Sequence, residues 1–290
     1  MEQTFAAPHP VLVFVRNEVG STAITAHRND TSHVSLTADT PGGKDLVGRS
    51  TVVCRPRVGR DIVVVNIPRA HGMKFIRRNG VTVRVHVPEG SDVRVISASA
   101  DVELNGSLGR ANIKTASGSF TADDVTDLRA KTASGDIEVG TVRGALRMQS
   151  AAGDLRCVRV DGPTSVTTVS GDIEVGSAGD RMEVRVTSGD VRLGDIMGDL
   201  TVAVVSGNVK VLSVTEGSTH VRTVSGRIEV GIARGATLSV DAESMSGSVH
   251  SDIPLEDGPR AAGADPRLTL TLKTVSGDVL ITRGVEAFVR

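Results

Sequence analysis

A short phrase centred on glycine returns at a nearly fixed interval between residues 99 and 282. Its copies are Ser99-Ala100-Asp101, Ser117-Gly118-Ser119, Ser134-Gly135-Asp136, Ala152-Gly153-Asp154, Ser170-Gly171-Asp172, Ser188-Gly189-Asp190, Ser206-Gly207-Asn208, Ser225-Gly226-Arg227, Ser246-Gly247-Ser248 and Ser276-Gly277-Asp278. Between the central residues the intervals are 18, 17, 18, 18, 18, 18, 19, 21 and 30. A period of this kind is the signature of a solenoid, in which each repeat forms one coil.

Within each coil, apolar and polar residues alternate. After Gly135, the apolar Ile137 and Val139 flank Glu138, and the alternation resumes from Leu146. Successive side chains of a strand point to opposite faces, so this pattern predicts short strands with one buried face.

The coils align into three apolar columns. The first column is Phe120, Ile137, Leu155, Ile173, Val191, Val209, Ile228, Val249 and Val279; the second is Leu128, Leu146, Thr164, Met182 and Leu200; the third is Ala130, Met148, Val166, Val184, Val202, Val221, Ala242 and Leu272. Such columns arise when equivalent positions stack about 4.8 Å apart in a parallel ladder. We therefore predict an all-β parallel β-solenoid with coils of about 18 residues, each made of two or three short strands. Because parallel crossovers are right-handed, we expect a right-handed β-helix.

An outward column supports the same register. It reads Glu138, Arg156, Glu174, Arg192, Lys210 and Glu229. Its signs largely alternate, and opposite charges on neighbouring strands stabilise a ladder by roughly 0.2–1 kcal/mol.

The chain divides into two parts by its pattern. Residues 1–90 are rich in strand formers but keep no period, and we expect a β-rich N-terminal cap or degenerate coils there, with a turn at Glu18–Ser21 and a loop at Thr40–Gly43. Residues 91–290 form the repeat domain, with a Pro- and Gly-rich insertion loop at 252–267 and a last coil from Leu268 to Thr282. An uncapped end coil exposes unpaired backbone. We therefore expect residues 284–290, with Val285 and Phe288, to cover that last coil.

Charge and composition restrict the partners. The net charge is −1, and the chain has no Trp or Tyr. Between 55 and 84 there are eight basic residues, Arg55, Arg57, Arg60, Arg69, Lys74, Arg77, Arg78 and Arg84, against one acid, Asp61. This region is open to two interpretations, an anion-binding patch or a solvated strand face with arginine stems over apolar surface. Because these cations are not regularly interleaved with aromatic residues that could stack on bases, we favour the second interpretation and expect no nucleic-acid partner.

Targeting signals and cysteines point to an ordinary intracellular chain. Residues Met1–Phe5 lack the basic and apolar regions of a signal peptide, and no apolar stretch approaches the roughly 18 residues of a membrane span. We expect a cytoplasmic protein with no membrane span. Cys157 shares a column with Val175 and Leu193, which predicts a small buried hydrophobe, and nothing in the sequence supports a disulfide with Cys54.

No residue set predicts catalysis, a cofactor or a metal. The aspartates after the corners, Asp101, Asp136, Asp154, Asp172, Asp190 and Asp278, could line a calcium site, but one carboxylate per coil favours backbone hydrogen bonds in the turn. The threonines of the Thr-x-Ser phrases, Thr115, Thr132, Thr168, Thr223 and Thr274, could form an outer hydroxyl array, but alternation turns them inward. The seven histidines, His9, His27, His33, His71, His86, His220 and His250, are scattered without metal-ligand spacing.

The repeat phrase also resembles a known family. Val87-Pro88-Glu89-Gly90-Ser91, followed by copies of Thr-x-Ser-Gly-Asp-Ile/Val-x-Val such as Thr132–Val139, is similar to the bacterial "putative adhesin" β-strand-repeat family, a domain of unknown function. The resemblance covers residues 81–283 and implies a β-solenoid. Its motif is structural, so it assigns no catalytic residue.

These observations favour a non-enzymatic β-solenoid that acts as a scaffold or interaction surface. We expect a protein partner or self-association. A polymer-forming or adhesin-like solenoid is the alternative, and a carbohydrate-active β-helix comes third. Carbohydrate-cleaving helices usually carry aromatic platforms for sugar rings, which a chain without Trp or Tyr does not offer.

Overall fold

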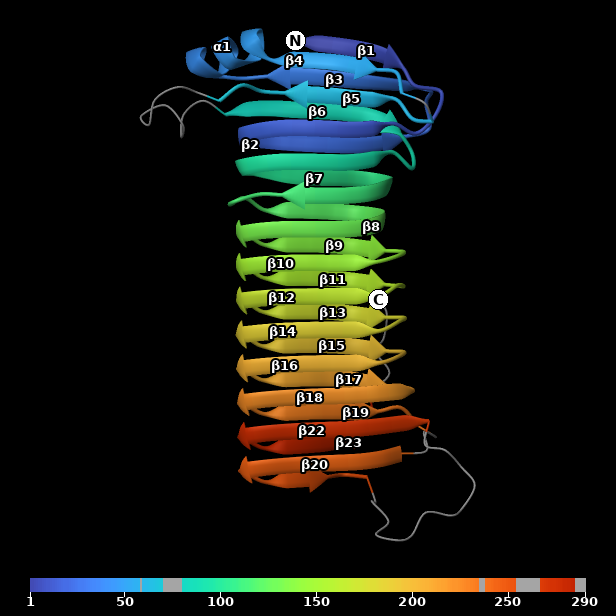
Figure 1. The fold of residues 1–290 in the computed structure, drawn as a ribbon, viewed down its shortest axis with the longest axis vertical. Helices are drawn as coiled ribbons and strands as arrows, with labels where there is room; N and C mark the ends of the chain where they lie inside the picture. Colours follow the sequence, from blue (N-terminus) through green and yellow to red (C-terminus); the bar gives the residue numbers. More distant parts are fainter. Residues whose placement is uncertain (58, 70–79, 235–237, 254–266, 285–290) are drawn as a thin grey trace. The chain divides into compact units, whose positions relative to one another are not determined.

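The computed structural model describes residues 1–57, 59–69, 80–234, 238–253 and 267–284. They form two compact units, Met1–Ala151 and Ala152–Arg290. Both units consist of β-strands, and the one helix among the described residues is α1 (Pro41–Arg49) in the first unit (Figure 1). Nine residues are too few to cross a bilayer, and no described helix is long and apolar enough to do so. The predicted all-β class is confirmed.

The first unit combines a parallel stack with an antiparallel end. Its strands are β1 (Glu2–Ala6), β2 (Leu12–His27), β3 (Thr31–Thr37), β4 (Thr51–Arg55), β5 (Ile62–Asn66), β6 (Val81–Pro88), β7 (Asp92–Lys114), β8 (Phe120–Ser134), β9 (Ile137–Val142) and β10 (Leu146–Ala152). The long β2 runs parallel to β7 on one side and to β5 and β6 on the other. Antiparallel pairs β1–β3, β3–β6 and β4–β5 close this end, as a cap should.

Two details of the first unit differ from the sequence prediction. The expected loop at Thr40–Gly43 is the start of α1, where Thr40 Oγ1 accepts the Gly43 N–H at 3.1 Å and Pro41 occupies the first turn. The turn expected near Gly20 does not end a strand, because β2 continues through it with Gly20 at φ +122°. Only glycine adopts this conformation without strain.

The second unit is a regular stack of coils, each with two strands. Its strands are β11 (Leu155–Val160), β12 (Thr164–Ser170), β13 (Ile173–Ala178), β14 (Met182–Ser188), β15 (Val191–Ile196), β16 (Leu200–Ser206), β17 (Val209–Val214), β18 (Gly217–Ser225), β19 (Ile228–Ile232), β20 (Leu238–Ser246), β21 (Val249–Ser251), β22 (Leu268–Ser276) and β23 (Val279–Arg283). Odd-numbered strands from β11 to β19 pair in parallel on one face, and even-numbered strands from β12 to β18 pair on the other. The predicted parallel β-solenoid is confirmed.

The core is made of the predicted columns. Leu155, Ile173 and Val191 pair in one ladder and are fully buried. In the first unit, Ile137 pairs with Phe120, and both are buried. Because each coil exposes its apolar residues unless a neighbour covers them, the stack and not the single coil provides the hydrophobic stabilisation.

Glycine at the corners allows the coils to approach closely. Gly207, at φ +147°, lies so near the preceding corner that a Cβ would collide with the carbonyl oxygen of Gly189. The period of the sequence therefore follows from a backbone contact that only glycine permits.

The order of the last coils differs from the sequence. β22 pairs with β18 on one side and β20 on the other, and β23 lies likewise between β19 and β21. The coil at 268–283 is thus the penultimate one, and the coil at 238–251 is the outer one. The inward residues explain this: Leu270 and Leu272 are fully buried, while the outer coil has the smaller Val240 and Ala242 at these two positions.

The expectation that the coil from Leu268 to Thr282 ends the stack is therefore wrong, because β20 and β21 lie beyond it. Gly284 donates its N–H to the Ile232 carbonyl oxygen at 2.8 Å, beside the coil that precedes the penultimate one. Val285, Phe288 and residues 254–266 of the predicted insertion loop lie outside the described residues.

Candidate functional site

The aspartates after the corner glycines join successive coils. In the second unit, Asp154 Oδ1 accepts the Asp172 N–H at 2.9 Å, and Asp172 Oδ1 accepts the Asp190 N–H at 2.8 Å. Asp190 Oδ1 accepts the Asn208 N–H at 2.9 Å. Each carboxylate thus satisfies a backbone donor at the next corner of the stack, and not a donor within its own turn as predicted.

The same ladder ends at the outer coil. Asp278 Oδ1 accepts both the N–H and the hydroxyl of Ser248, at 3.0 and 2.8 Å, and these hydrogen bonds lower the pKa of Asp278. Across the described residues, no three His, Cys, Asp or Glu side chains are arranged to hold a metal ion. The hydrogen bonds between successive coils therefore account for the aspartates after the corner glycines.

The threonines of the repeat phrase point inward. Thr168, Thr223 and Thr274 are buried. The Thr168 hydroxyl donates to the Ser170 carbonyl oxygen at 3.0 Å, within its own corner. The hydroxyl array that an ice-binding surface needs is therefore absent at these three positions, and the prediction of an internal threonine ladder is confirmed.

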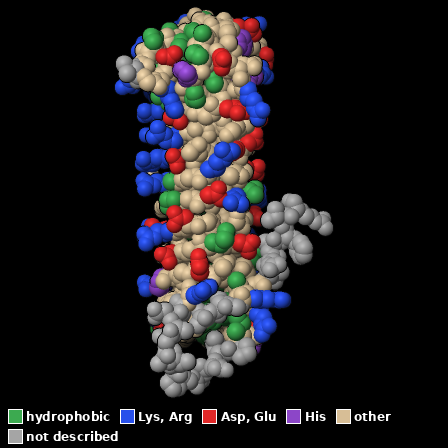
Figure 2. Space-filling view, turned by 90° about the vertical axis from the view of Figure 1, so that its right-hand side faces the viewer, with side chains coloured by type: hydrophobic (Ala, Val, Ile, Leu, Met, Phe, Trp, Pro, Cys, Tyr) green, Lys and Arg blue, Asp and Glu red, His purple; other side chains and the backbone are tan. Residues whose placement is uncertain are grey.

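The outward charged column lies along the odd-numbered strands of the second unit. Arg156 pairs with Glu174 at 3.4 Å, and Lys210 pairs with Glu229 at 2.8 Å. Arg192 stands next to Lys210 in the ladder and reaches instead to Asp190, at 3.1 Å. In Figure 2, acidic and basic side chains are mixed over the middle of the view, while Lys and Arg side chains gather along its left edge.

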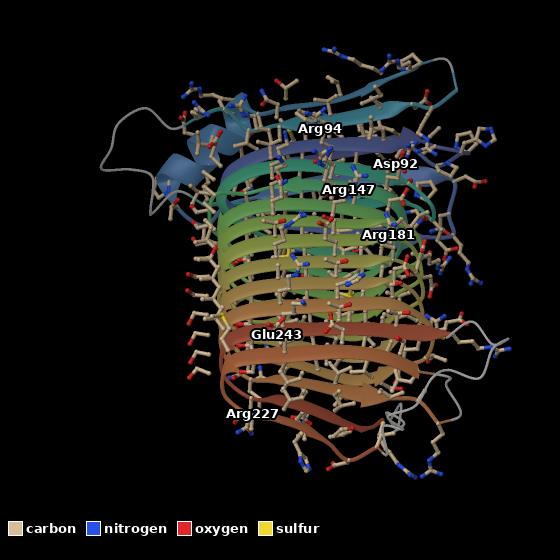
Figure 3. All side chains as sticks on the ribbon, turned by 60° about the horizontal axis from the view of Figure 1, so that its bottom comes forward. Asp92, Arg94, Arg147, Arg181, Arg227 and Glu243 are labelled. Atoms are coloured by element: carbon tan, nitrogen blue, oxygen red, sulfur yellow. The ribbon has the colours of Figure 1, made fainter. Side chains whose placement is uncertain are left out.

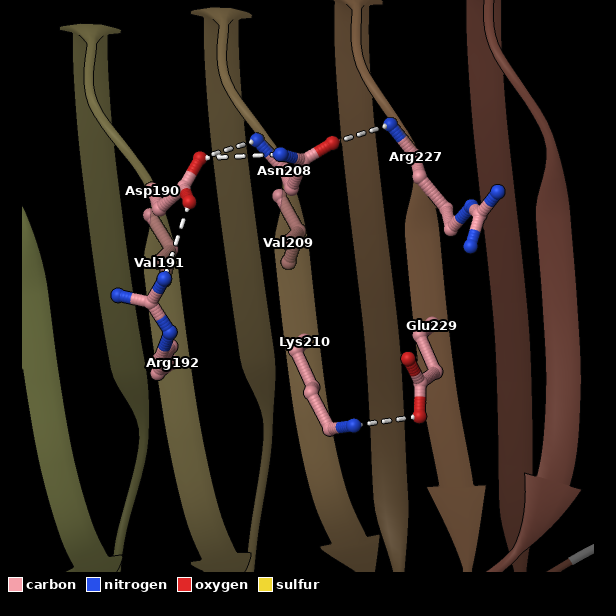
Figure 4. Close-up of a pocket in the computed structure, with 8 residues that line it drawn as sticks. All are labelled: Asp190, Val191, Arg192, Asn208, Val209, Lys210, Arg227 and Glu229. Atoms are coloured by element: carbon pink, nitrogen blue, oxygen red, sulfur yellow. Dashed lines mark hydrogen bonds and ion pairs between the residues drawn. The ribbon is translucent and has the colours of Figure 1, made fainter.

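A shallow groove crosses this column (Figure 4). It is lined by Asp190, Val191, Arg192, Asn208, Val209, Lys210, Arg227 and Glu229, and its volume is about 180 Å³. Its three cations all have carboxylate partners. Arg192 and Lys210 form the ion pairs described above, and Arg227 lies 3.6 Å from Asp278. A groove whose charges are already compensated has little attraction for an anion.

A second groove lies beside the first, over two glycines. Gly176, Gly194 and Leu212 are among the residues that line it, and its volume is about 420 Å³. A Cβ at Gly194 would collide with the Gly176 carbonyl oxygen. The depression is thus accounted for by close packing of the backbone. The grooves bring together no nucleophile and base.

An exposed apolar stripe was not predicted. It consists of Val169, Val205, Val224, Val275 and Met245, which are 45–77% exposed. Four of them lie on adjacent strands, because the register sets Val205 beside Val224, Val224 beside Val275, and Val275 beside Met245. The signal was in the sequence: in Thr-x-Ser-Gly the threonine points inward, so the residue marked x points outward.

The basic region of the first unit is only partly described. Arg60 pairs with Asp92, and Arg69 Nε lies 3.0 Å from Glu18. Lys74, Arg77 and Arg78 lie outside the described residues. Two of the cations counted in this region are therefore compensated, in keeping with a solvated face.

Three histidines that look scattered in the sequence meet in the first unit. His27 and His33 each have their ring centroid 6.2–6.3 Å from that of His86, on strands β2, β3 and β6. Partial burial, and then the two neighbouring rings, lower the pKa of His86. Pairing of non-consecutive strands creates this cluster, and no spacing in the sequence reveals it.

The cysteines are both free, and Cys157 is buried. Burial raises the pKa of the Cys157 thiol to about 12. Cys54, half-buried on β4, also has a raised pKa, through burial and then the nearby Asp61. Cys157 therefore serves packing, as its column predicted.

The family comparison matches most of the chain. The model of Toastrack DUF4097 matches residues 61–182 and 125–282, which together exceed half of the 290 residues. No curated protein matches the chain.

Solved structures of similar length share only low identity with it. A "putative adhesin" from Bacteroides fragilis is 12% identical, with a TM-score of 0.45 over 97% of this chain and 96% of that one. A "putative adhesin" from Parabacteroides merdae is 13% identical, with a TM-score of 0.38 over 98% and 96%. A "putative lipid binding protein" from Parabacteroides distasonis is 11% identical, with a TM-score of 0.36 over 96% of both chains. At these scores the likenesses assign no function.

Proposed function

Because the chain belongs to the Toastrack DUF4097 family, whose function is unknown, we propose its role from its own surface. The role is that of a non-enzymatic β-solenoid that binds a protein partner along the apolar stripe. A cytoplasmic location stays a prediction.

The observation that carries the proposal is the continuity of the stripe. Val205, Val224 and Val275 occupy the same outward position on the adjacent strands β16, β18 and β22. They are 50%, 49% and 45% exposed. Scattered surface valines need no explanation, but a contiguous apolar row marks an interaction surface. Parallel strands are about 4.8 Å apart, so the four adjacent members extend roughly 14 Å along the stack.

The surroundings of the stripe resemble the rim of an interface. On the corner side lies a row of exposed serines, including Ser225 and Ser276. On the other side, Arg222 lies next to Lys273 in the ladder. An apolar centre with a polar, solvated border is the arrangement of transient protein interfaces, whose overall composition is close to that of ordinary surface.

The test replaces one valine of the stripe and one valine elsewhere. Val224→Lys puts a charge in the middle of the stripe. Val158→Lys makes the same change at a valine of β11 that is 68% exposed on the other sheet. Both positions are solvent-exposed, so both variants should unfold at the same denaturant concentration as the parent chain.

The readout is affinity capture from native extract, with mass spectrometry of the retained proteins. The proposal requires a protein that is retained by the parent chain and by Val158→Lys but lost with Val224→Lys. Retention that is equal for all three chains would contradict it, because the stripe would then contribute nothing to binding.

A further inference from the structure

The outer coil of the second unit presents a strand edge. Among the described strands, β20 pairs only with β22, and β21 pairs only with β23. β20 is nine residues long. Its outer edge therefore offers backbone donors and acceptors in the spacing that a further strand would match.

The inward side of this coil is also incompletely covered. Val240 and Ala242 are half-buried, whereas their neighbours Leu270 and Leu272 on β22 are fully buried. Val249 on β21 is 47% exposed, although every other described member of its column is buried. An added strand with apolar side chains on the inward side would continue the core over this surface.

The outward side of β20 is acidic. Asp241 and Glu243 have side chains 67% and 63% exposed, and both pair with Lys273 of β22, at 3.5 and 3.2 Å. Glu243 (labelled in Figure 3) is directly opposite Lys273 in the ladder. The carboxylates thus have a cation on the β22 side. A strand on the other side would favour a second cation at the same register.

We propose that β20 accepts, by strand addition, an extended segment of a partner protein that carries apolar side chains inward and basic side chains outward. The main chain supplies the pairing, and Asp241 and Glu243 select the basic register. This inference rests on the strand edge and not on the apolar stripe. The peptide titration described below and the affinity capture that tests the stripe can therefore fail independently.

Two features of the outer coil disfavour a second copy as the occupant. If two β20 strands met across a two-fold axis in full register, Asp241 would lie opposite Glu243 of the other copy, and like charges destabilise the pair. The corner ladder also ends at Ser248, whose hydroxyl already donates to Asp278. Ser248 brings no carboxylate for a further corner, so the site suits one strand and not a whole coil.

The probe is a fluorescein-labelled peptide with the sequence of residues 268–276, Leu-Thr-Leu-Thr-Leu-Lys-Thr-Val-Ser. This is the sequence of β22, the natural neighbour of β20 on its other side. The control peptide carries Glu in place of Lys. Both are titrated with the full-length protein and with Glu243→Lys, and fluorescence anisotropy reports binding. Hydrogen exchange then locates the amides that the peptide protects.

We expect the Lys peptide to bind the parent protein about tenfold more tightly than the Glu peptide. The preference should reverse with Glu243→Lys, and the protected amides should lie in β20. Absence of binding, or a preference that Glu243→Lys leaves unchanged, would overturn the proposal.

Two further results would assign the edge to another occupant and also overturn it. One is binding only after residues 254–266 are replaced by a short Gly-Ser linker, which would mean that this segment of the chain itself occupies the edge. The other is a dimer, seen by light scattering, in which the β20 amides are protected without peptide.

Discussion

Substitution of Cys157 tests whether the inward columns determine stability. Its side chain is 3% exposed and lies beside Val175 of the next coil. The thiol makes one weak contact, to the Arg159 carbonyl oxygen at 3.6 Å. Cys157→Ser keeps the shape but introduces a hydroxyl. The C–O bond is shorter than the C–S bond, so the serine oxygen stays too far from that carbonyl for a normal hydrogen bond.

A buried hydroxyl without a good partner costs about 1–3 kcal/mol, and we expect Cys157→Ser to lower the free energy of unfolding by that amount. Cys157→Val is the matched control, because valine already fills the equivalent position in the next coil. It should cost less than the serine. Urea unfolding followed by circular dichroism measures both. A serine variant as stable as the parent chain would refute the assignment of this column to the core.

The chemistry of the thiol gives a second measurement on the unmodified protein. A shift of the Cys157 pKa from 9.0 to about 12 leaves roughly a thousandfold less thiolate at pH 8. Cys54, which is only half-buried, is the internal reference. A thiol reagent should modify Cys54 first and Cys157 only after unfolding. Equal rates for the two thiols in the native protein would show that the column faces solvent.

Three more predictions concern the histidine cluster, the corner ladder and the last coils. The folded-state pKa of His86 is below its usual 6.5, so the unfolded chain binds the proton more readily than the folded chain does. Thermal stability should therefore be full above pH 6.5 and fall as the pH drops below it. His86→Asn should reduce this dependence of stability on pH. Asp190→Ala removes the acceptor of the Asn208 N–H and should lower the free energy of unfolding by about 1–2 kcal/mol, whereas Asp190→Asn, which keeps an acceptor, should cost less; equal losses in urea titrations would argue against the ladder. Ending the chain after Ile253 removes β22 and β23, and the amides of β20 should then lose their protection in hydrogen exchange. Protected β20 amides in this variant would mean that the outer coil has moved next to β18 and β19, which would contradict a fixed order of the coils in the stack.

The columns were predictable because they depend on local alternation and a fixed period. Leu155, Ile173 and Val191 occur at intervals of 18 residues, and parallel pairing in register is the arrangement that buries all three. For the corner aspartates, the sequence predicted hydrogen bonds within their own turns, whereas in the structure each bonds to the equivalent residue of the next coil.

The features that the sequence did not reveal depend on which segments, far apart in the chain, pair with one another. Whether the coil at 238–251 or the coil at 268–283 takes the inner position depends on how well each fills the core, and both fit the period. The meeting of His27 with His86 depends on the pairing of β2 with β6. Helix α1 was missed because Pro41 and two glycines resemble a loop, although Thr40 and Pro41 also form a helix start.

The position of β22 and β23 between earlier strands has a consequence for synthesis. Domains made on the ribosome begin to fold from the N-terminal end, and in most of the second unit each new coil can add to the coil before it. The outer coil cannot follow this rule, because its neighbour in the finished protein is made after it. Residues 238–251 must therefore wait, or pair temporarily with β18 and β19 and be displaced when residues 268–283 emerge. The outer coil therefore cannot reach its place in the stack until residues 268–283 have been translated.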